Sequence, residues 1–229
     1  MHSISLRKLF IFFLVFAVFF SVNSLFAQKQ FEGKIKFSIS DGGNNMIMDY
    51  IIKNNMVRIE MPGNQGGAMI MKDKKMYMVM PSQKMYMEFS MDKMKKMAEK
   101  YKGKANSKSH VENFDINSMR TGKTKEIFGH KCEQWIYNDK DENTTVEMWI
   151  ATDMGNFFFA QNPMAPSNGP AWQRQLEGKK FFPMEVISKD SDGTVKNVFK
   201  VIEIKNVSVN SDLFNIPEGF NKMTIPGMN

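Results

Sequence analysis

Apolar and polar residues alternate strictly in the first stretch after position 30. In "FEGKIKFSIS", Phe31, Ile35 and Phe37 fall on one side of an extended chain, while Lys34 and Lys36 fall on the other. A period of two is typical of a strand with one buried face. The stretch therefore predicts a half-buried strand, which ends at the turn residues "DGGNN".

Similar short patterns, separated by turn residues, recur through most of the chain. The further strands expected are 46–53, 56–61, 68–72, 75–80, 84–89, 123–128, 131–138, 144–151, 182–189 and 194–205. Between 153 and 178 the alternation is lost, and we expect a long, partly helical loop that covers apolar side chains. The pattern predicts a mainly β (α+β) fold, in which a large curved antiparallel sheet of about ten to eleven strands forms a half-barrel. One or a few helices are expected to cover it.

Methionine occupies every second position on both sides of a turn in "KKMYMVMPSQKMYMEF". If 73–74 and 81–84 are the turns of two successive hairpins, pairing brings seven methionines onto one face of three strands. They are Met69, Met71, Met76, Met78, Met80, Met85 and Met87, and Tyr77, Val79, Tyr86 and Glu88 fall on the opposite face. The pattern predicts a continuous surface of thioethers.

Three interpretations of this surface stay open. Methionine fills irregular spaces in cores, so the surface could be solid packing. The same flexibility suits a cavity for an acyl chain or another hydrophobic ligand. Thioethers are also soft ligands for Cu(I). The candidate ligand-binding residues are the seven methionines together with Met94, and no set of metal ligands stands out among them.

After Ser90 the period changes from two to that of a helix, which predicts an amphipathic helix over 90–101. Met91, Met94 and Met97 share one side of this helix. The other side carries its lysines, Lys93, Lys95, Lys96 and Lys100. We expect the methionine side to lie on the thioether surface and the lysine side to face outward, where it could meet an anionic membrane surface.

The first 27 residues follow a different pattern. Arg7 and Lys8 precede the apolar run "LFIFFLVFAVFF", and the small and polar residues of "SVNSLFA" end at Ala27. This is the order of a secretory signal peptide, and the run is shorter than the ~20 residues of a membrane-spanning helix. We expect cleavage after Ala27, which leaves a single domain over 28–229. No cysteine lies near that point to carry a lipid anchor, so the expected location is periplasmic or secreted.

Composition adds few candidates for chemistry. The formal net charge of +7 is modest, and most of it lies in the lysine-rich stretch between Asp92 and Lys108, so it does not indicate a nucleic-acid partner. Cys132 is the one cysteine, so an internal disulfide is excluded. We find no motif of a serine nucleophile, a zinc protease, a phosphate loop or a paired-cysteine metal site. His130 and Cys132 share a strand face, but a buried, inert thiol is the preferred interpretation. The sequence predicts no catalytic residue and no cofactor.

Five blocks of sequence carry a resemblance to known proteins. They are "MVRIEM", "MIMKDKKMYMVMPSQKMYMEF", "TGKTKEIFGHKCEQW", "VEMWIA" and "LFNIPEGF", in this order. Together they resemble an uncharacterised family of exported bacterial proteins named only as a domain of unknown function. Their order is also similar to that of the outer-membrane lipoprotein carriers LolA and LolB. The resemblance implies a curved antiparallel sheet with helices over its concave apolar side, and it implies no catalytic residues. The carriers open with a helix, whereas a strand comes first here, so the resemblance extends to the fold and not to lipoprotein transport.

These observations lead to an expected function. We expect an exported, non-enzymatic protein that binds a lipid or another hydrophobic molecule in the concave apolar face of its sheet. One alternative is a Cu(I)-binding protein that uses the methionine-rich face. The other is a structural module of the cell envelope with a solid core and no ligand.

Overall fold

A computed structural model of the chain describes residues 31–63, 66–93, 96, 115–139, 143–157, 176 and 179–224. All of them belong to one compact unit, which begins at Phe31. The predicted signal peptide at 1–27 lies outside the described residues, as do Met94, Met97 and His110. Among the described residues we find no helix with the length and hydropathy of a membrane span.

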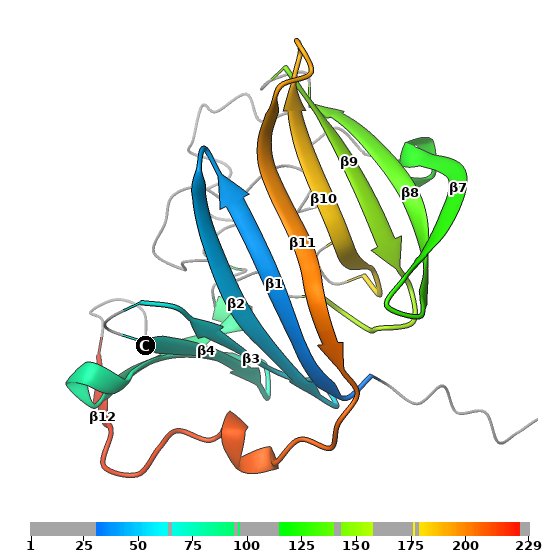
Figure 1. Ribbon diagram of the computed structural model, residues 1–229. Helices are drawn as coiled ribbons and strands as arrows, with labels where there is room; N and C mark the ends of the chain where they lie inside the picture. The colour runs from blue at the N-terminus through cyan, green and yellow to red at the C-terminus, as the bar shows by residue number, and fades with distance from the viewer. Residues whose placement is uncertain are drawn as a thin grey trace, which may run out of the picture. The chain divides into compact units, whose positions relative to one another are not determined.

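The described chain forms one twelve-stranded sheet. Its strands are β1 (Gly33–Asp41), β2 (Asn44–Lys53), β3 (Met56–Met61), β4 (Gly67–Lys72), β5 (Lys75–Met80), β6 (Met85–Ser90), β7 (Arg120–Ile127), β8 (His130–Asp139), β9 (Thr144–Ala151), β10 (Phe182–Asp190), β11 (Val195–Lys205) and β12 (Asn221–Met223). Two antiparallel meanders, β1–β6 and β7–β11, build most of it, and they join where β1 pairs with β11 (Figure 1).

The strand count corrects the prediction of ten to eleven strands. The strand that the sequence did not indicate is β12, which is only three residues long and shows no alternation. It pairs in parallel with the edge strand β6, with Asn221 opposite Met85. The sheet is therefore not purely antiparallel, because a non-local segment supplies its last strand.

The predicted covering helices also need correction. Instead of complete α-helices, the described residues form three short 3-10 helices, η2 (Pro81–Gln83), η3 (Ile116–Met119) and η4 (Ser211–Phe214). Of the helix expected over 90–101, residues 91–93 and 96 are helical, and most of the rest lies outside the described residues. Ser90 caps the start of this helical turn, because its hydroxyl accepts a hydrogen bond from the backbone N–H of Lys93 at 3.4 Å.

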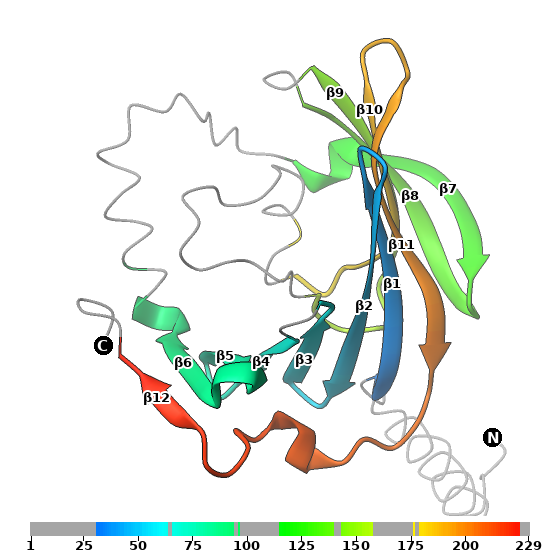
Figure 2. The ribbon, with the colours of Figure 1, turned by 60° about the vertical axis from the view of Figure 1, so that its left-hand side comes forward.

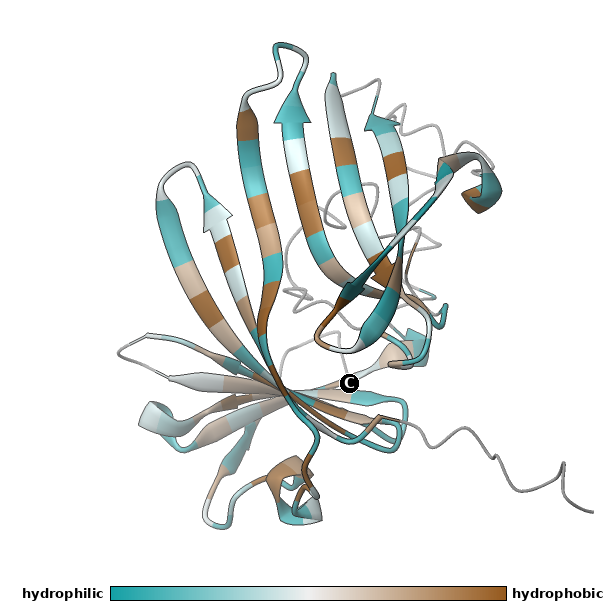
Figure 3. Ribbon diagram, turned by 45° about the vertical axis from the view of Figure 1, so that its right-hand side comes forward, coloured by the Kyte–Doolittle hydropathy of each residue, from teal (hydrophilic) through white to brown (hydrophobic). Residues whose placement is uncertain are grey.

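The sheet is strongly curved, and its concave side is here called the inner face. Figure 2 shows β3–β6 at a steep angle to β7–β11, with β1 and β2 between them. Figure 3 shows the alternation of hydropathy along the strands that lets one face be apolar. The main core lies on the inner face and includes Phe37, Tyr50, Trp135, Met148 and Phe182, all almost fully buried.

The connection between β9 and β10 contributes to the inner core. Its described residues Met154, Phe157 and Leu176 are all buried against it. The ring of Phe157 lies among four others, with centroid distances of 5.6 Å to Phe37, 5.3 Å to Tyr50, 5.0 Å to Phe182 and 5.6 Å to Phe199. The expectation that this loop covers apolar side chains is confirmed for these residues.

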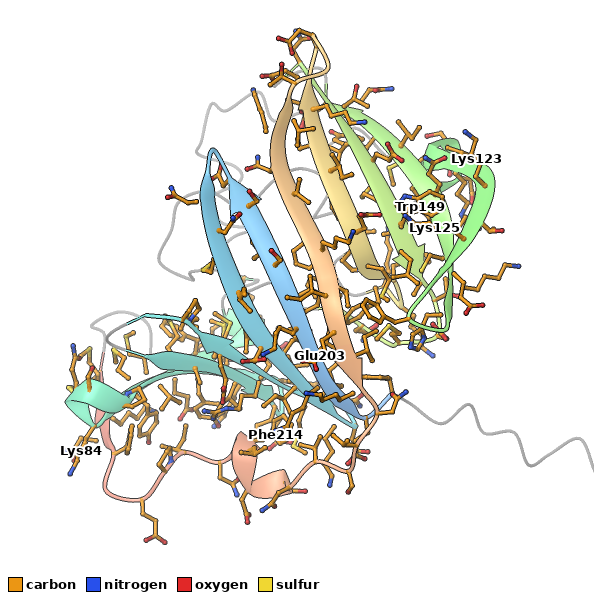
Figure 4. The ribbon with its side chains drawn as sticks, viewed as in Figure 1. Lys84, Lys123, Lys125, Trp149, Glu203 and Phe214 are labelled. Atoms are coloured by element: carbon orange, nitrogen blue, oxygen red, sulfur yellow. The ribbon has the colours of Figure 1, made fainter. Side chains whose placement is uncertain are left out.

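The C-terminal segment covers the opposite, outer face of β3–β6. Phe214 of η4 is 0% exposed and packs with Ile70 and Val79 in a second core, beneath β3 and β4 (Figure 4). The backbone N–H of Val209 donates to the carboxylate of Glu32 at 2.8 Å, which fixes the start of the segment. Strands β4 and β5 are therefore buried on both faces, although the sequence pattern suggested one.

The outer face of the second meander is occupied by paired charges. The carboxylate of Glu185 lies 2.6 Å from the Lys125 ammonium and 3.3 Å from that of Lys200. The same Lys125 ammonium lies 4.1 Å from the ring centroid of Trp149, and Figure 4 shows the two side chains together. Lys125 and Lys200 share this one carboxylate, so the charges are paired but do not cancel.

We expect Glu185→Gln to reduce the loss of stability in acid. Burial alone would raise the pKa of Glu185, but the hydrogen bonds and charges of Lys125 and Lys200 outweigh it and hold the pKa below the ordinary 4.5. A lowered carboxyl pKa stabilises the folded state above pH 4.5, and this stabilisation is lost as the pH falls through the lowered value. The difference in melting temperature between pH 7 and pH 3 should shrink in Glu185→Gln. The exposed Glu218→Gln serves as the control, and an unchanged difference in Glu185→Gln would contradict the assignment.

Candidate functional site

The register of β4, β5 and β6 is the one that the methionine spacing predicted. Met69 lies opposite Met78, and Met71 lies opposite Met76. Across the next hairpin the pairs are Met78 with Met87, Met80 with Met85, and Met76 with Phe89. The turn at 81–84 is a 3-10 helix that begins at Pro81 and closes at Lys84, whose left-handed backbone lets its N–H reach the Pro81 carbonyl at 3.1 Å. The predicted thioether surface is therefore present on the inner face.

This methionine face changes from core to surface along its length. Its buried part is made of Met69, Met71, Met76 and Met87, which belong to the main core. Toward η2 the side chains of Met78, Met80 and Met85 are only half-buried. The side chains of the first group are thus part of the core, whereas those of the second group are partly exposed. Met94, the eighth candidate, lies outside the described residues.

Gly67 opens a space within the half-buried part. It lies opposite Met61 on β3, and the pairing of Ala68 with Val79 places Met80 on its other side, on β5. A Cβ atom at Gly67 would lie 3.3 Å from the Met61 methyl carbon and 3.2 Å from the Val79 carbonyl oxygen. Because glycine has no side chain, the Met61 methyl group can lie close over Gly67, where a Cβ atom would crowd it.

A pocket of about 390 Å³ lies beside Gly67. Met61, Met78 and Met80 line it together with Gly67, and the β3–β4 and β5–β6 connections close it with Pro62, Gly63, Gly66, Ser82 and Gln83. Its lining contains no charged side chain, and its size lies at the lower end of the range for small-molecule sites, roughly 300–1,000 Å³. Met61 and Gly67 were not among the candidate residues predicted from the sequence. The usable signal was the spacing of two residues between Gly67, Met69 and Met71, which puts the glycine on the same strand face as the two methionines.

The lysines proposed to meet a membrane are only partly described. Lys93 and Lys96 are exposed, while Lys95 and Lys100 lie outside the described residues. The helical turn that carries Lys93 begins directly after β6. Its first residue is held by a hydrogen bond that the backbone N–H of Met91 donates to the Lys74 carbonyl at 3.0 Å. At least two of the four lysines therefore lie on the surface beyond the buried end of the methionine face.

Cys132 does not supply a nucleophile. The thiol is fully buried, and burial is the main cause that raises its pKa to about 11. It contacts the backbone carbonyl of His130 at 3.4 Å, while the His130 ring pairs with the Asp153 carboxylate at 2.8 Å. A protonated, enclosed thiol is inert. Over the described part of the chain, no three His, Cys, Asp or Glu side chains are grouped to hold a metal ion.

Comparison with known proteins identifies a family and distant structural likenesses. Residues 31–220 match a family described as a domain of unknown function, DUF4412. No curated protein matches the sequence. The expected membership in a family named only as a domain of unknown function is confirmed. The curved sheet with an apolar inner face agrees with the fold that the resemblance to the lipoprotein carriers implies.

Three solved structures illustrate the distant likenesses. An uncharacterised conserved protein from Thermus thermophilus is 8% identical, with a TM-score of 0.49, 90% of this chain and 98% of that chain covered. A chain of the MucA/MucB complex of Pseudomonas aeruginosa is 8% identical, with a TM-score of 0.42, and the match covers 82% of this chain and 56% of that chain. PNGF-II is 12% identical, with a TM-score of 0.45, and the match covers 84% of this chain and 30% of PNGF-II. This chain therefore spans less than a third of PNGF-II. At these scores none of them carries functional information to this chain.

Proposed function

Because the chain belongs to the DUF4412 family, whose description assigns no activity, we propose a function from the site itself. The protein is an exported, non-enzymatic binder of a flexible apolar molecule, such as a lipid acyl chain. The observation that carries this proposal is the uncharged pocket where Met61, Met78 and Met80 leave the buried core. The signal peptide expected at 1–27 supports export, and the domain then extends over 28–229.

Physical chemistry favours a thin, flexible apolar ligand. Flexible thioether side chains repack around varied shapes, which suits acyl chains of different length. The absence of charged side chains from the described pocket lining disfavours binding of a carboxylate or another anion there, because it would lose hydration without gaining a cationic partner. A volume of about 390 Å³ suits one chain better than the several chains of a triacylated lipoprotein.

The basic segment after β6 extends this proposal to membranes. Its exposed Lys93 and Lys96, with Lys95 and Lys100, would face anionic head groups while the pocket takes up or releases a chain. Such binding weakens as salt rises, since exposed charges are screened. Co-sedimentation with anionic vesicles at low and high salt tests it, and salt-independent binding would contradict it.

Substitution of two methionines on β5 separates binding from packing. Met78→Ala removes a half-buried side chain of the pocket lining, so the affinity for a fluorescent fatty acid should fall about fivefold, or ~1 kcal/mol. Its loss of unfolding free energy should stay well under the ~2–5 kcal/mol typical of a buried methionine. Met76→Ala is the matched control, because Met76 is on the same strand and face but is buried away from the pocket.

Met76→Ala should show the reverse pattern, with a full ~2–5 kcal/mol loss of stability and nearly unchanged affinity of the remaining folded protein. Fluorescence titration and urea unfolding measure both quantities. If the parent protein does not bind the fatty acid, and Met78→Ala loses as much stability as Met76→Ala, the pocket is part of a solid core. The structural module without a ligand would then be the better description.

A further inference from the structure

The pocket at Gly67 brings together thioether groups from strands that are not neighbours. Met61 lies on β3, while Met78 and Met80 lie on β5, two strands away. Adjacent strands are ~4.8 Å apart, so β3 and β5 are separated by ~10 Å. Normally the side chain of the strand between them would fill this distance, but here that residue is Gly67. The Met61 methyl carbon already lies over it, 3.3 Å from where a Cβ would be.

The donor atoms in this pocket are mostly soft. Its side chains offer three thioether sulfurs, one hydroxyl at Ser82 and one amide at Gln83, and no carboxylate, imidazole or ammonium. Hard cations such as Mg²⁺ and Ca²⁺ need carboxylate or carbonyl oxygens, and Zn²⁺ needs thiolate, imidazole or carboxylate. Neutral thioethers instead favour Cu(I) and other soft monovalent cations with a filled d shell, such as Ag(I).

We infer that Met61, Met78 and Met80 form a binding site for a soft monovalent cation, Cu(I) or Ag(I), in the pocket beside Gly67. Their partial exposure matters, because a cation entering a fully buried face would lose its hydration with no path for entry. The buried methionines of the same face, among them Met69 and Met76, lack this access. The inference goes beyond acyl-chain binding, and the two ligands would compete for one pocket.

Silver ion is a suitable test reagent, because it has the soft character of Cu(I) without its redox chemistry. The purified protein is titrated with Ag(I) in buffer free of chloride and thiols, and binding is followed by calorimetry and native mass spectrometry. One equivalent should bind. Loss of an outer-shell partner alone reduces metal affinity ~10–100-fold, so Met61→Leu, Met78→Leu and Met80→Leu combined should reduce it at least ~100-fold. Leucine keeps the apolar volume and removes only the sulfur.

The control replaces three methionines of the buried part, Met69→Leu, Met71→Leu and Met76→Leu, and should bind Ag(I) as the parent does. Cys132→Ala should also bind normally, which excludes the thiol as the ligand. Melting curves show whether each variant is folded, and the single variant Met80→Leu, with its half-exposed side chain, provides a milder test that should still weaken binding.

Three results would overturn the inference: no binding by the parent, equal loss in the two triple variants, or loss in Cys132→Ala. The fatty-acid titration is independent of all of them. Ag(I) binding without fatty-acid binding would reject only the proposed function, whereas the opposite result would reject only the metal site. If both bind, Ag(I) should displace the fatty acid from the parent and not from the variant that lacks the three sulfurs.

Discussion

Replacing Phe214 with alanine should lower the free energy of unfolding by ~3–5 kcal/mol, the usual range for a buried phenylalanine. The side chain is 0% exposed and lies in the core on the outer face of β4 and β5. Nothing else among the described residues of the tail is buried as deeply, so its removal should release η4 from the sheet. Urea unfolding measures the energy, and hydrogen exchange at 206–223 measures the release.

The control for this variant is Glu218→Ala, which lies in the same segment and is exposed. Its unfolding free energy should change by no more than ~0.5 kcal/mol, as at most surface sites. A loss below ~1 kcal/mol in Phe214→Ala would mean that the tail does not pack on the sheet in solution. The outer face of β4 and β5 would then be open to a partner.

Replacing Phe157 with alanine should also cost ~3–5 kcal/mol, and it should create a new binding site. The ring contacts four aromatic rings on the inner face, so its removal leaves a cavity walled by Phe37, Tyr50, Phe182 and Phe199. Apolar cavities of this kind stay dry and take up benzene. Benzene should therefore raise the melting temperature of Phe157→Ala and leave that of the parent unchanged.

Phe157→Leu is the matched control, because it keeps most of the apolar volume and should cost less than ~1.5 kcal/mol. If benzene stabilises the parent as strongly as Phe157→Ala, the centre of the inner face is already open, and the aromatic cluster does not fill it. The result decides where an apolar ligand enters. With Phe157 in place, the centre is filled by the protein itself, and the pocket at Gly67 is the accessible end.

The local pairing of β4, β5 and β6 was predictable because its determinants are local. Alternation fixed which residues share a face, and the turn signals fixed the register, so that Met78 lies between Met69 and Met87 as expected. Both signals act within a few residues, and pairing across a short turn admits few alternatives.

The features that were missed depend on segments far apart in sequence. The outer face carries Tyr77 on β5 and Tyr86 on β6, which is compatible with solvent, and the docked tail partly buries both side chains. The apolar residues Leu213, Phe214 and Ile216 were a usable signal for that docking. β12 gave none, because three residues are too few for a period. Gly67 was missed because the expected strand began at Ala68, one residue late.

The junction of the two meanders has a consequence for how the chain reaches its folded form. Each meander forms from strands that are close in sequence, but β1 pairs with β11 through partners as distant as Lys34 and Lys205. Such long-range closure is the slow part of folding. In a chain that emerges amino end first, the edge of β1 with Ile35 and Phe37 stays unpaired until almost all of the chain has followed. An open apolar edge of this kind attracts other chains, so crowding during synthesis would favour aggregation at this strand and a need for chaperones until β11 arrives.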